Sequence, residues 1–228
     1  TSALADGDGL GTLGYQWQSK PSGGAWGDIA GATSATLTLG DAEVGSSIRT
    51  LVTYTDNHGT FESVASSGTS LIANINDTPT GAPIVEGQTL ETSTLTANTA
   101  GIADIDGLGT INYQWQLSSD NSSWSDITGA TNKTYTLASN DVGKYVRVQS
   151  TFTDNHGTSE VVTSSATSTI KNVNNNPTGS VVISGTTTEN ATLSIDTSAL
   201  ADGDGLGTLR YQWQRSFDGT LYSDIANA

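Results

Sequence analysis

Three short acidic loops contain the residue types that bind hard cations. Each has the pattern Asp-x-Asp-Gly, and together they hold Asp6 and Asp8, Asp104 and Asp106, and Asp202 and Asp204. Asp56 and Asp154 stand at matching positions of two later hairpins. Calcium takes about six to eight oxygen ligands, and glycine allows backbone carbonyls to turn toward the ion. The loops therefore predict calcium sites, with an acidic surface turn as the alternative reading.

The acidic loops belong to a tandem repeat with a period of 98 residues. The segment Ala5–Gln18 returns as Ala103–Gln116 and as Ala201–Gln214, and no gap is needed to align the copies. A fixed period marks repeated structural units. We predict three units: residues 1–78, which lack their first two strands; the complete unit 79–176; and 177–228, the N-terminal half of a third unit. We therefore expect the sequence to be part of a longer chain.

Composition excludes several classes of partner. The chain has 23 acidic and 8 basic residues and a net charge of −15, so it would repel nucleic acid and anionic lipid but attract divalent cations. It has no cysteine, so its rigidity has to come from something other than disulfides, and metal ions are the obvious candidate. No apolar run approaches the roughly 18 residues of a membrane span. We predict no membrane span.

Apolar and polar residues alternate along Ile111–Leu117, with Trp115 on the apolar side. A period of two indicates a half-buried strand. Further short segments separated by turns are Glu91–Ala97, Trp124–Ile127, Thr134–Leu137, Val146–Phe152 and Thr158–Ile170. This spacing is typical of an all-β sandwich. We predict about seven antiparallel strands per unit, with Trp115 in the core.

Catalysis is not expected. The sequence contains no nucleophile elbow, metalloprotease motif or phosphate loop, and every acidic or aromatic cluster recurs with the period, whereas a catalytic site is normally built once. His58 and His156 occur singly in Asp-Asn-His-Gly turns. A zinc site needs three or four convergent ligands, so we assign both histidines a role in the turn.

One aromatic position recurs as Trp26, Trp124 and Tyr222. An exposed aromatic ring at each repeat could stack on a sugar. The alternative is an aromatic residue that covers the edge of the sandwich, where size matters more than identity. Threonine alternation at Thr36–Leu39 could similarly suggest a crystal-binding face, although threonine is simply a good strand residue.

Taken together, these motifs resemble two kinds of β-sandwich repeat. The Asp-x-Asp loop, the Thr-Asp-x-x-Gly turn and the linker Asn74–Pro79 look like the calcium motifs of cadherin repeats. The Tyr-Gln-Trp-Gln strand and the later Asp-Val-Gly look like an immunoglobulin-type sandwich. The whole chain resembles the extender repeats of giant bacterial surface adhesins, which are secreted by type I systems and often called RTX adhesins. This resemblance implies tandem Ig-like or cadherin-like Greek-key sandwiches in an elongated array.

The resemblance also implies calcium ligands where each linker meets the next unit. At the first junction they are Asn76, Asp77, Asp104, Asp106 and Asp154. At the second junction they are Asn174, Asn175, Asp202 and Asp204, and the matching residues of the first unit are Asp6, Asp8 and Asp56. Because Asn175 stands where the first linker has Asp77, we expect fewer or weaker ions at the second junction.

The sequence favours an extracellular, rod-like spacer that holds a distal binding domain away from a bacterial surface. Its expected cofactor is Ca²⁺. Its expected partners are neighbouring repeats, and a cell-surface or polysaccharide target reached through other domains. Residues near Ser180–Ile195 of one chain could add the strands that the first unit of another copy lacks. The alternative function is a polysaccharide-binding module that uses the repeated aromatic residues.

Overall fold

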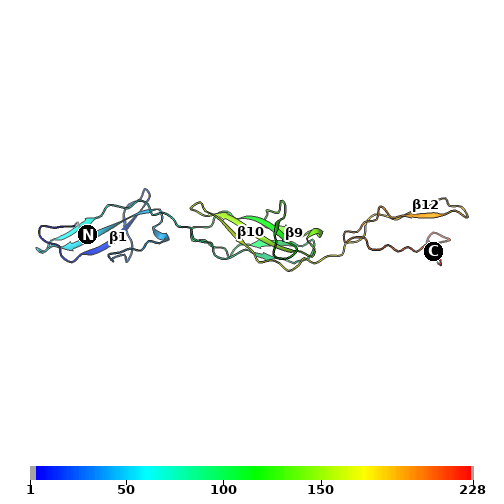
Figure 1. The fold of residues 1–228 in the computed structure, drawn as a ribbon, viewed down its shortest axis with the longest axis horizontal. Helices are drawn as coiled ribbons and strands as arrows, with labels where there is room; N and C mark the ends of the chain where they lie inside the picture. The colour runs from blue at the N-terminus through cyan, green and yellow to red at the C-terminus, as the bar shows by residue number, and fades with distance from the viewer. Residues whose placement is uncertain (1–3, 227–228) are drawn as a thin grey trace. The chain divides into compact units, whose positions relative to one another are not determined.

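The computed structural model describes residues 4–226, which are nearly all in β-strands, turns and extended segments (Figure 1). Contacts divide the chain into two compact units. The first comprises the chain up to Pro83 with Thr99–Tyr113 and Gln149–Thr163, and the second comprises Ile84–Asn98, Gln114–Val148 and the chain from Ser164 onward. Each compact unit therefore includes part of the middle repeat. The outermost residues of the predicted repeats, 1–3 and 227–228, lie outside the described residues.

The first repeat contains one antiparallel sheet in the order β2-β1-β3-β4. Its strands are β1 (Gly14–Pro21), β2 (Gly27–Asp28), β3 (Ser46–Thr55) and β4 (Phe61–Ala65), and a single 3₁₀ turn, η1 (Asp41–Glu43), precedes β3. Strand β3 buries Ile48, Val52 and Tyr54 on one face, as period-two alternation requires.

The middle repeat has seven strands and one 3₁₀ turn. They are β5 (Ile84–Glu86), β6 (Thr94–Asn98), β7 (Asn112–Ser118), β8 (Ser125–Asp126), β9 (Thr134–Thr136), η2 (Ser139–Asp141), β10 (Tyr145–Thr153) and β11 (Ser159–Thr163). Their sheet orders are β5-β6-β9 and β11-β10-β7-β8. Pairing of β6 with β9 and of β7 with β10 requires crossovers between sheets, which is the Greek-key arrangement of an Ig-like sandwich. The predicted all-β fold is confirmed.

Trp115 anchors the core of the middle repeat. Its side chain is fully buried, its indole N–H donates to the carbonyl of Asn132 at 2.9 Å, and its ring centroid lies 5.8 Å from that of Tyr135. Along β10, Val146, Val148 and Phe152 are buried on one face, as predicted. The core position assigned to Trp115 is therefore confirmed.

Strand β7 differs from the simple alternation that its sequence suggests. Gln116 and Ser118 are buried, whereas Leu117 is only half-buried. Gln116 tolerates burial because its amide donates to Asp126 Oδ1 at 2.8 Å and its carbonyl oxygen accepts from Arg147 Nε at 2.7 Å. A polar side chain is buried at little cost when its hydrogen bonds are satisfied.

The predicted strand Thr158–Ile170 is shorter than expected. Regular pairing ends with β11 at Thr163. The amides of Ser164 and Thr167 then donate to Val148 and Val146 of β10, and the amide of Ile170 donates to Lys144, just before that strand. The hydroxyls of Ser164 and Thr167 accept the amides of Val148 and Val146 at 3.0 Å each. Side-chain oxygens thus replace backbone carbonyls as acceptors here, which interrupts the strand without leaving these amides unpaired.

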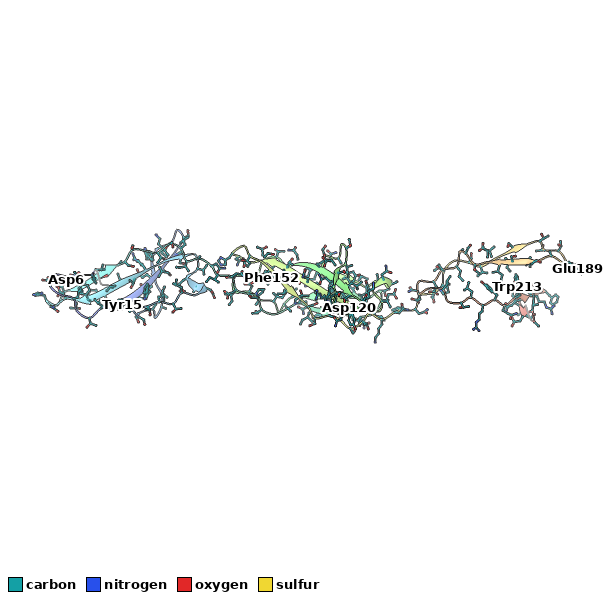
Figure 2. All side chains as sticks on the ribbon, viewed as in Figure 1. Asp6, Tyr15, Asp120, Phe152, Glu189 and Trp213 are labelled. Atoms are coloured by element: carbon teal, nitrogen blue, oxygen red, sulfur yellow. The ribbon has the colours of Figure 1, made fainter. Side chains whose placement is uncertain are left out.

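The third repeat forms two hairpins in the described residues. The first pairs β12 (Val182–Gly185) with β13 (Leu193–Asp196), and the second pairs β14 (Gln214–Arg215) with β15 (Ser223–Asp224). Trp213, labelled in Figure 2, matches Trp115 but is only half-buried. Of the three matching tryptophans, Trp17, Trp115 and Trp213, Trp115 is fully buried and the other two are half-buried. None of the helices in residues 4–226 has the length and apolar character needed to cross a membrane.

Candidate metal centre at the repeat junctions

The acidic loop of the middle repeat is a tight turn that glycine makes possible. The amide of Asp106 donates to Asp104 Oδ1 at 2.8 Å, and the amide of Gly107 donates to the Asp104 carbonyl at 3.2 Å. Gly107 has φ +102°, and a Cβ at this position would lie 2.0 Å from Nδ2 of Asn155. Only glycine lets the loop approach the hairpin after β10 this closely.

The first linker is bonded to this loop. The amide of Asp77 donates to Asp106 Oδ2 at 2.7 Å. Thr80 and Ala103 exchange two backbone hydrogen bonds of 2.7 and 3.0 Å. The structure thus bonds Asp77 to Asp106, and Asp104 lies in the same loop. Asn76 instead donates its side-chain amide to Glu160 Oε1 at 2.7 Å.

The hairpin after β10 adds Asp154 to the same compact unit. Its side chain is 6% exposed, and its Oδ1 accepts the amides of His156 and Thr158 at 2.8 Å each. The amide of Asn155 donates to the carbonyl of Asp106 at 3.1 Å, which connects the hairpin to the acidic loop. The histidine contributes its backbone here, in agreement with a role in the turn.

Two carboxylate oxygens of this region have no donor. Asp104 Oδ2 and Asp154 Oδ2 are buried, and no described residue donates a hydrogen bond to either atom. Leaving a buried anionic oxygen without a partner is costly. A hard cation would satisfy such oxygens, so their chemistry fits Ca²⁺, which Asp104 and Asp154 would each hold through the oxygen that lacks a donor.

The electrostatics of the linker agree with this fit. Burial raises the pKa of Asp77 above its ordinary value, and the neighbouring carboxylates of Asp41, Asp106 and Asp104 raise it further. At Asp154, burial favours a higher pKa, but the amides of Thr158 and His156 hold the pKa below its ordinary value. The first junction therefore concentrates negative charge that a cation would neutralise.

The described side chains of the first junction do not form a complete metal-binding site by themselves. Within residues 4–226, His, Cys, Asp and Glu side chains do not gather in groups of three or more close enough to hold a metal by themselves. Calcium sites in proteins also use backbone carbonyls, asparagine side chains and water. Any ion here would need such oxygens in addition to the carboxylates.

The second junction has the same layout but fewer free oxygens. The amide of Asn175 donates to Asp204 Oδ2 at 2.7 Å, and its side-chain amide donates to Asp204 Oδ1 at 3.3 Å. Asp204 N in turn donates to Asp202 Oδ1 at 2.9 Å, and Asn174 Nδ2 donates to the Asn175 carbonyl at 3.2 Å. The bond from the Asn175 amide lowers the pKa of Asp204. Protein donors thus occupy both oxygens of Asp204.

Glu91 is a buried carboxylate that the sequence analysis did not assign to a junction. It is 2% exposed and accepts the hydroxyl of Ser139 and, at 3.2 Å, the amide of Val173 in the second linker. The hydrogen bond from Ser139 is the largest effect that lowers its pKa. In the sequence, Glu91 is marked only by a matching glutamate 98 residues later, Glu189. An exposed strand residue could recur in the same way, so this recurrence does not predict that Glu91 is buried.

The acidic loop of the first repeat has the same backbone hydrogen bond as the loop of the middle repeat, but its first aspartate has an additional side-chain donor. Asp8 N donates to Asp6 Oδ1 at 2.8 Å, as in the middle repeat, and Asp56 Oδ1 accepts the amides of His58 and Thr60 at 2.8 Å each. Here the hydroxyl of Tyr54 also donates to Asp6 Oδ2 at 2.8 Å. That bond raises the pKa of Tyr54 to about 12.

The recurring aromatic residues lie under arginine side chains. The guanidinium carbon of Arg49 is 4.4 Å from the ring centroid of Trp26, and that of Arg147 is 4.3 Å from the ring centroid of Trp124. Both tryptophans are half-buried. Tyr222, by contrast, is 61% exposed. The two tryptophan rings therefore already have a cation on one face.

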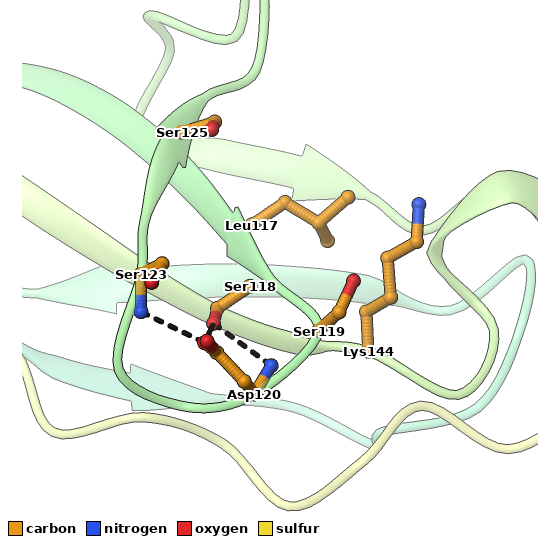
Figure 3. Close-up of a pocket in the computed structure, with 7 residues that line it drawn as sticks. All are labelled: Leu117, Ser118, Ser119, Asp120, Ser123, Ser125 and Lys144. Carbon is orange, nitrogen blue, oxygen red and sulfur yellow. Dashed lines mark hydrogen bonds between the residues drawn. The ribbon is translucent and has the colours of Figure 1, made fainter.

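A hollow of about 340 Å³ lies beside the turn between β7 and β8 (Figure 3). Its lining consists of Leu117, Ser118, Ser119, Asp120, Ser123, Ser125 and Lys144. Asp120 closes the turn by accepting the amides of Ser123 and Ser122 at 2.8 and 2.9 Å. Trp124 is not among the lining residues, so this hollow lacks the aromatic platform that a sugar site would use.

The comparisons with known proteins give one family match and distant structural likenesses. Residues 76–175 match the profile of a domain of unknown function, DUF8696. No curated protein matches the sequence significantly.

Fifteen solved chains match the structure. One is the tetra-tandem repeat in the extending region of a large adhesion protein, with 13% identity and a TM-score of 0.27 over 91% of this chain and 62% of that one. Another is the FN1–FN3 region of chicken CNTN1, with 13% identity and a TM-score of 0.28 over 98% of this chain and 78% of that one. At these TM-scores neither likeness bears on function.

Proposed function

We propose that this chain is a set of extender repeats from an extracellular cell-surface adhesin or surface filament, in which calcium fixes the junctions between repeats. The observation that carries the proposal is the pair of buried, unpartnered oxygens, Asp104 Oδ2 and Asp154 Oδ2, in the loop and hairpin nearest the first linker. The bond from the Asp77 amide to Asp106 connects the linker to the same loop. A cation bound there would neutralise the loop to which the linker is bonded.

A spacer role follows from what the repeats have in common. The features that recur in residues 4–226 are the acidic loop, the tight hairpin and the packed strands. A short, hydrogen-bonded linker favours fixed spacing between neighbours over free motion. A protein built this way serves to separate its ends, and the repeats themselves are its first partners.

Calcium titration tests the proposal. Ca²⁺ should bind the 228-residue chain and raise its melting temperature by mass action. The affinity should lie in the weak extracellular range, about 10⁻⁴ to 10⁻³ M. The double variant Asp104→Asn/Asp154→Asn should lose the effect, whereas Asp126→Asn, a surface carboxylate bonded to Gln116, should keep it. Equal melting of the wild-type chain with calcium and with chelator would refute the proposal.

The second candidate function is polysaccharide binding. What favours it is the exposed ring of Tyr222 in the third repeat, since Arg49 and Arg147 already cover Trp26 and Trp124. Tryptophan fluorescence titrated with soluble polysaccharides distinguishes the two functions, because a spacer should show no saturable change. The pairing of Ser180–Ile195 with another copy stays a prediction.

A further inference from the structure

The acidic loops of the first and middle repeats are built alike at the level of the backbone. In both loops the second aspartate donates its amide to the first at 2.8 Å. A Cβ on Gly11 would lie 2.0 Å from the Thr55 carbonyl oxygen, and a Cβ on Gly109 would lie 2.0 Å from that of Thr153. Each loop therefore meets the end of its strand, β3 or β10, in the same way.

The aromatic residue two positions before the hairpin aspartate differs between the two repeats. Tyr54 near the end of β3 donates its hydroxyl to Asp6 Oδ2 at 2.8 Å. The matching residue of β10, 98 positions later, is Phe152, which is 2% exposed and has no hydroxyl (Figure 2 labels Asp6 and Phe152). In that repeat, the matching oxygen, Asp104 Oδ2, is buried and receives no hydrogen bond from the described residues.

We infer that the residue at the position of Tyr54 and Phe152 selects which acidic loops bind a cation. A tyrosine satisfies the loop aspartate with its own hydroxyl, and a phenylalanine leaves that oxygen for an ion. The inference deepens the proposed calcium function and rests on it. It assigns the stronger site to the loop of Asp104 and the weaker one to the loop of Asp6.

A second oxygen supports this assignment. Asp154, in the hairpin that follows Phe152, is 6% exposed, and its Oδ2 also lacks a donor among the described residues. Its Oδ1 is fully engaged by the amides of His156 and Thr158. Two segments thus each bury one anionic oxygen that receives no hydrogen bond from the described residues. Such an arrangement is unfavourable without a positive partner.

The decisive variant is Phe152→Tyr, measured in chelator and in calcium. In chelator its new hydroxyl should donate to Asp104 Oδ2 and raise the melting temperature by about 4 to 8 °C. In calcium the same hydroxyl should compete with the ion and weaken binding about tenfold. Phe152→Leu is the matched control: it keeps an apolar side chain without a donor, so it should lower the melting temperature in chelator while retaining calcium affinity.

The reciprocal variant Tyr54→Phe should behave in the opposite way, melting lower in chelator and gaining calcium affinity. Outcomes separate this inference from the proposed function. If the wild-type chain binds calcium but Phe152→Tyr binds it equally well, the selector role is wrong and the calcium function stands. If the wild-type chain binds no calcium, both are wrong, whatever Phe152→Tyr does in chelator.

Discussion

The backbone amide of Asp77 donates a 2.7 Å hydrogen bond to Oδ2 of Asp106, which links the first linker to the acidic loop of the next repeat. The matching bond at the second junction runs from Asn175 to Asp204, also at 2.7 Å. The backbone connection is therefore the same, and the junctions differ in the linker side chain. A carboxylate stands at the first and an amide at the second.

Asp77→Asn should give the first junction the chemistry of the second. Because the pKa of Asp77 is raised, the folded chain binds this proton more tightly than the unfolded chain, so stability falls as the pH rises from 3.8 through the folded pKa. At pH 7 in chelator the variant should therefore melt higher than the wild type. Its calcium affinity should be about tenfold lower, which calorimetric titration measures.

Asn175→Asp is the reverse experiment at the second junction. It adds a carboxylate next to Asp204, so it should lower the melting temperature in chelator and increase calcium binding. The account would be contradicted if the two substitutions shifted calcium affinity in the same direction.

Core and junction should respond separately to substitution. Trp115→Ala removes a fully buried ring and should cost about 3 to 5 kcal/mol of unfolding free energy. Asp106→Ala should leave the near-ultraviolet circular dichroism of the folded core unchanged and reduce calcium binding. Chemical denaturation with and without calcium checks both, and similar behaviour of the two variants would show that site and core are not separable.

The positions of the acidic loops and of the core strand could be predicted from the sequence, because both recur with the 98-residue period. The recurrence of Asp104 and Asp106 identified the loops, and the alternation around Trp115 identified the core strand. Whether each carboxylate has a hydrogen-bond donor in the folded chain could not be predicted in this way. Asp6 has a donor because Tyr54, 48 residues later in the chain, bonds to it, and the residue that matches Tyr54 in the middle repeat is Phe152, which has no hydroxyl. Nor does a strand pattern reveal that Glu91 is buried beside the second linker.

The turn at Asp120 should make stability sensitive to acid. The amides of Ser123, drawn in Figure 3, and of Ser122 stabilise its ionised form and hold its pKa below the ordinary value of 3.8. This contribution is present in full above that value and is lost as the pH falls toward the depressed pKa. Asp120→Ser introduces the residue type that the first repeat has at the matching position, Ser22. This variant should melt lower than the wild type at pH 7. The difference should shrink in melting curves recorded below pH 3.8.

The arginine over Trp124 should contribute to stability rather than to ligand binding. Arg147 stacks on this ring and donates to Gln116, so Arg147→Gln should cost about 1 to 2 kcal/mol. Lys133→Gln removes the same charge from an exposed position and should be nearly neutral. Denaturation midpoints compare the two, and an equal loss for both variants would mean that net charge, not the stacked contact, is responsible.

Small-angle X-ray scattering of the 228-residue chain with calcium and with chelator tests the central claim most directly. If calcium fixes the junctions, adding it should increase the maximum dimension and narrow the distribution of conformations, because carboxylates that repel one another become bridged. The Asp104→Asn/Asp154→Asn variant should not respond. Identical scattering of the wild-type chain in calcium and in chelator would contradict the claim that calcium organises these repeats.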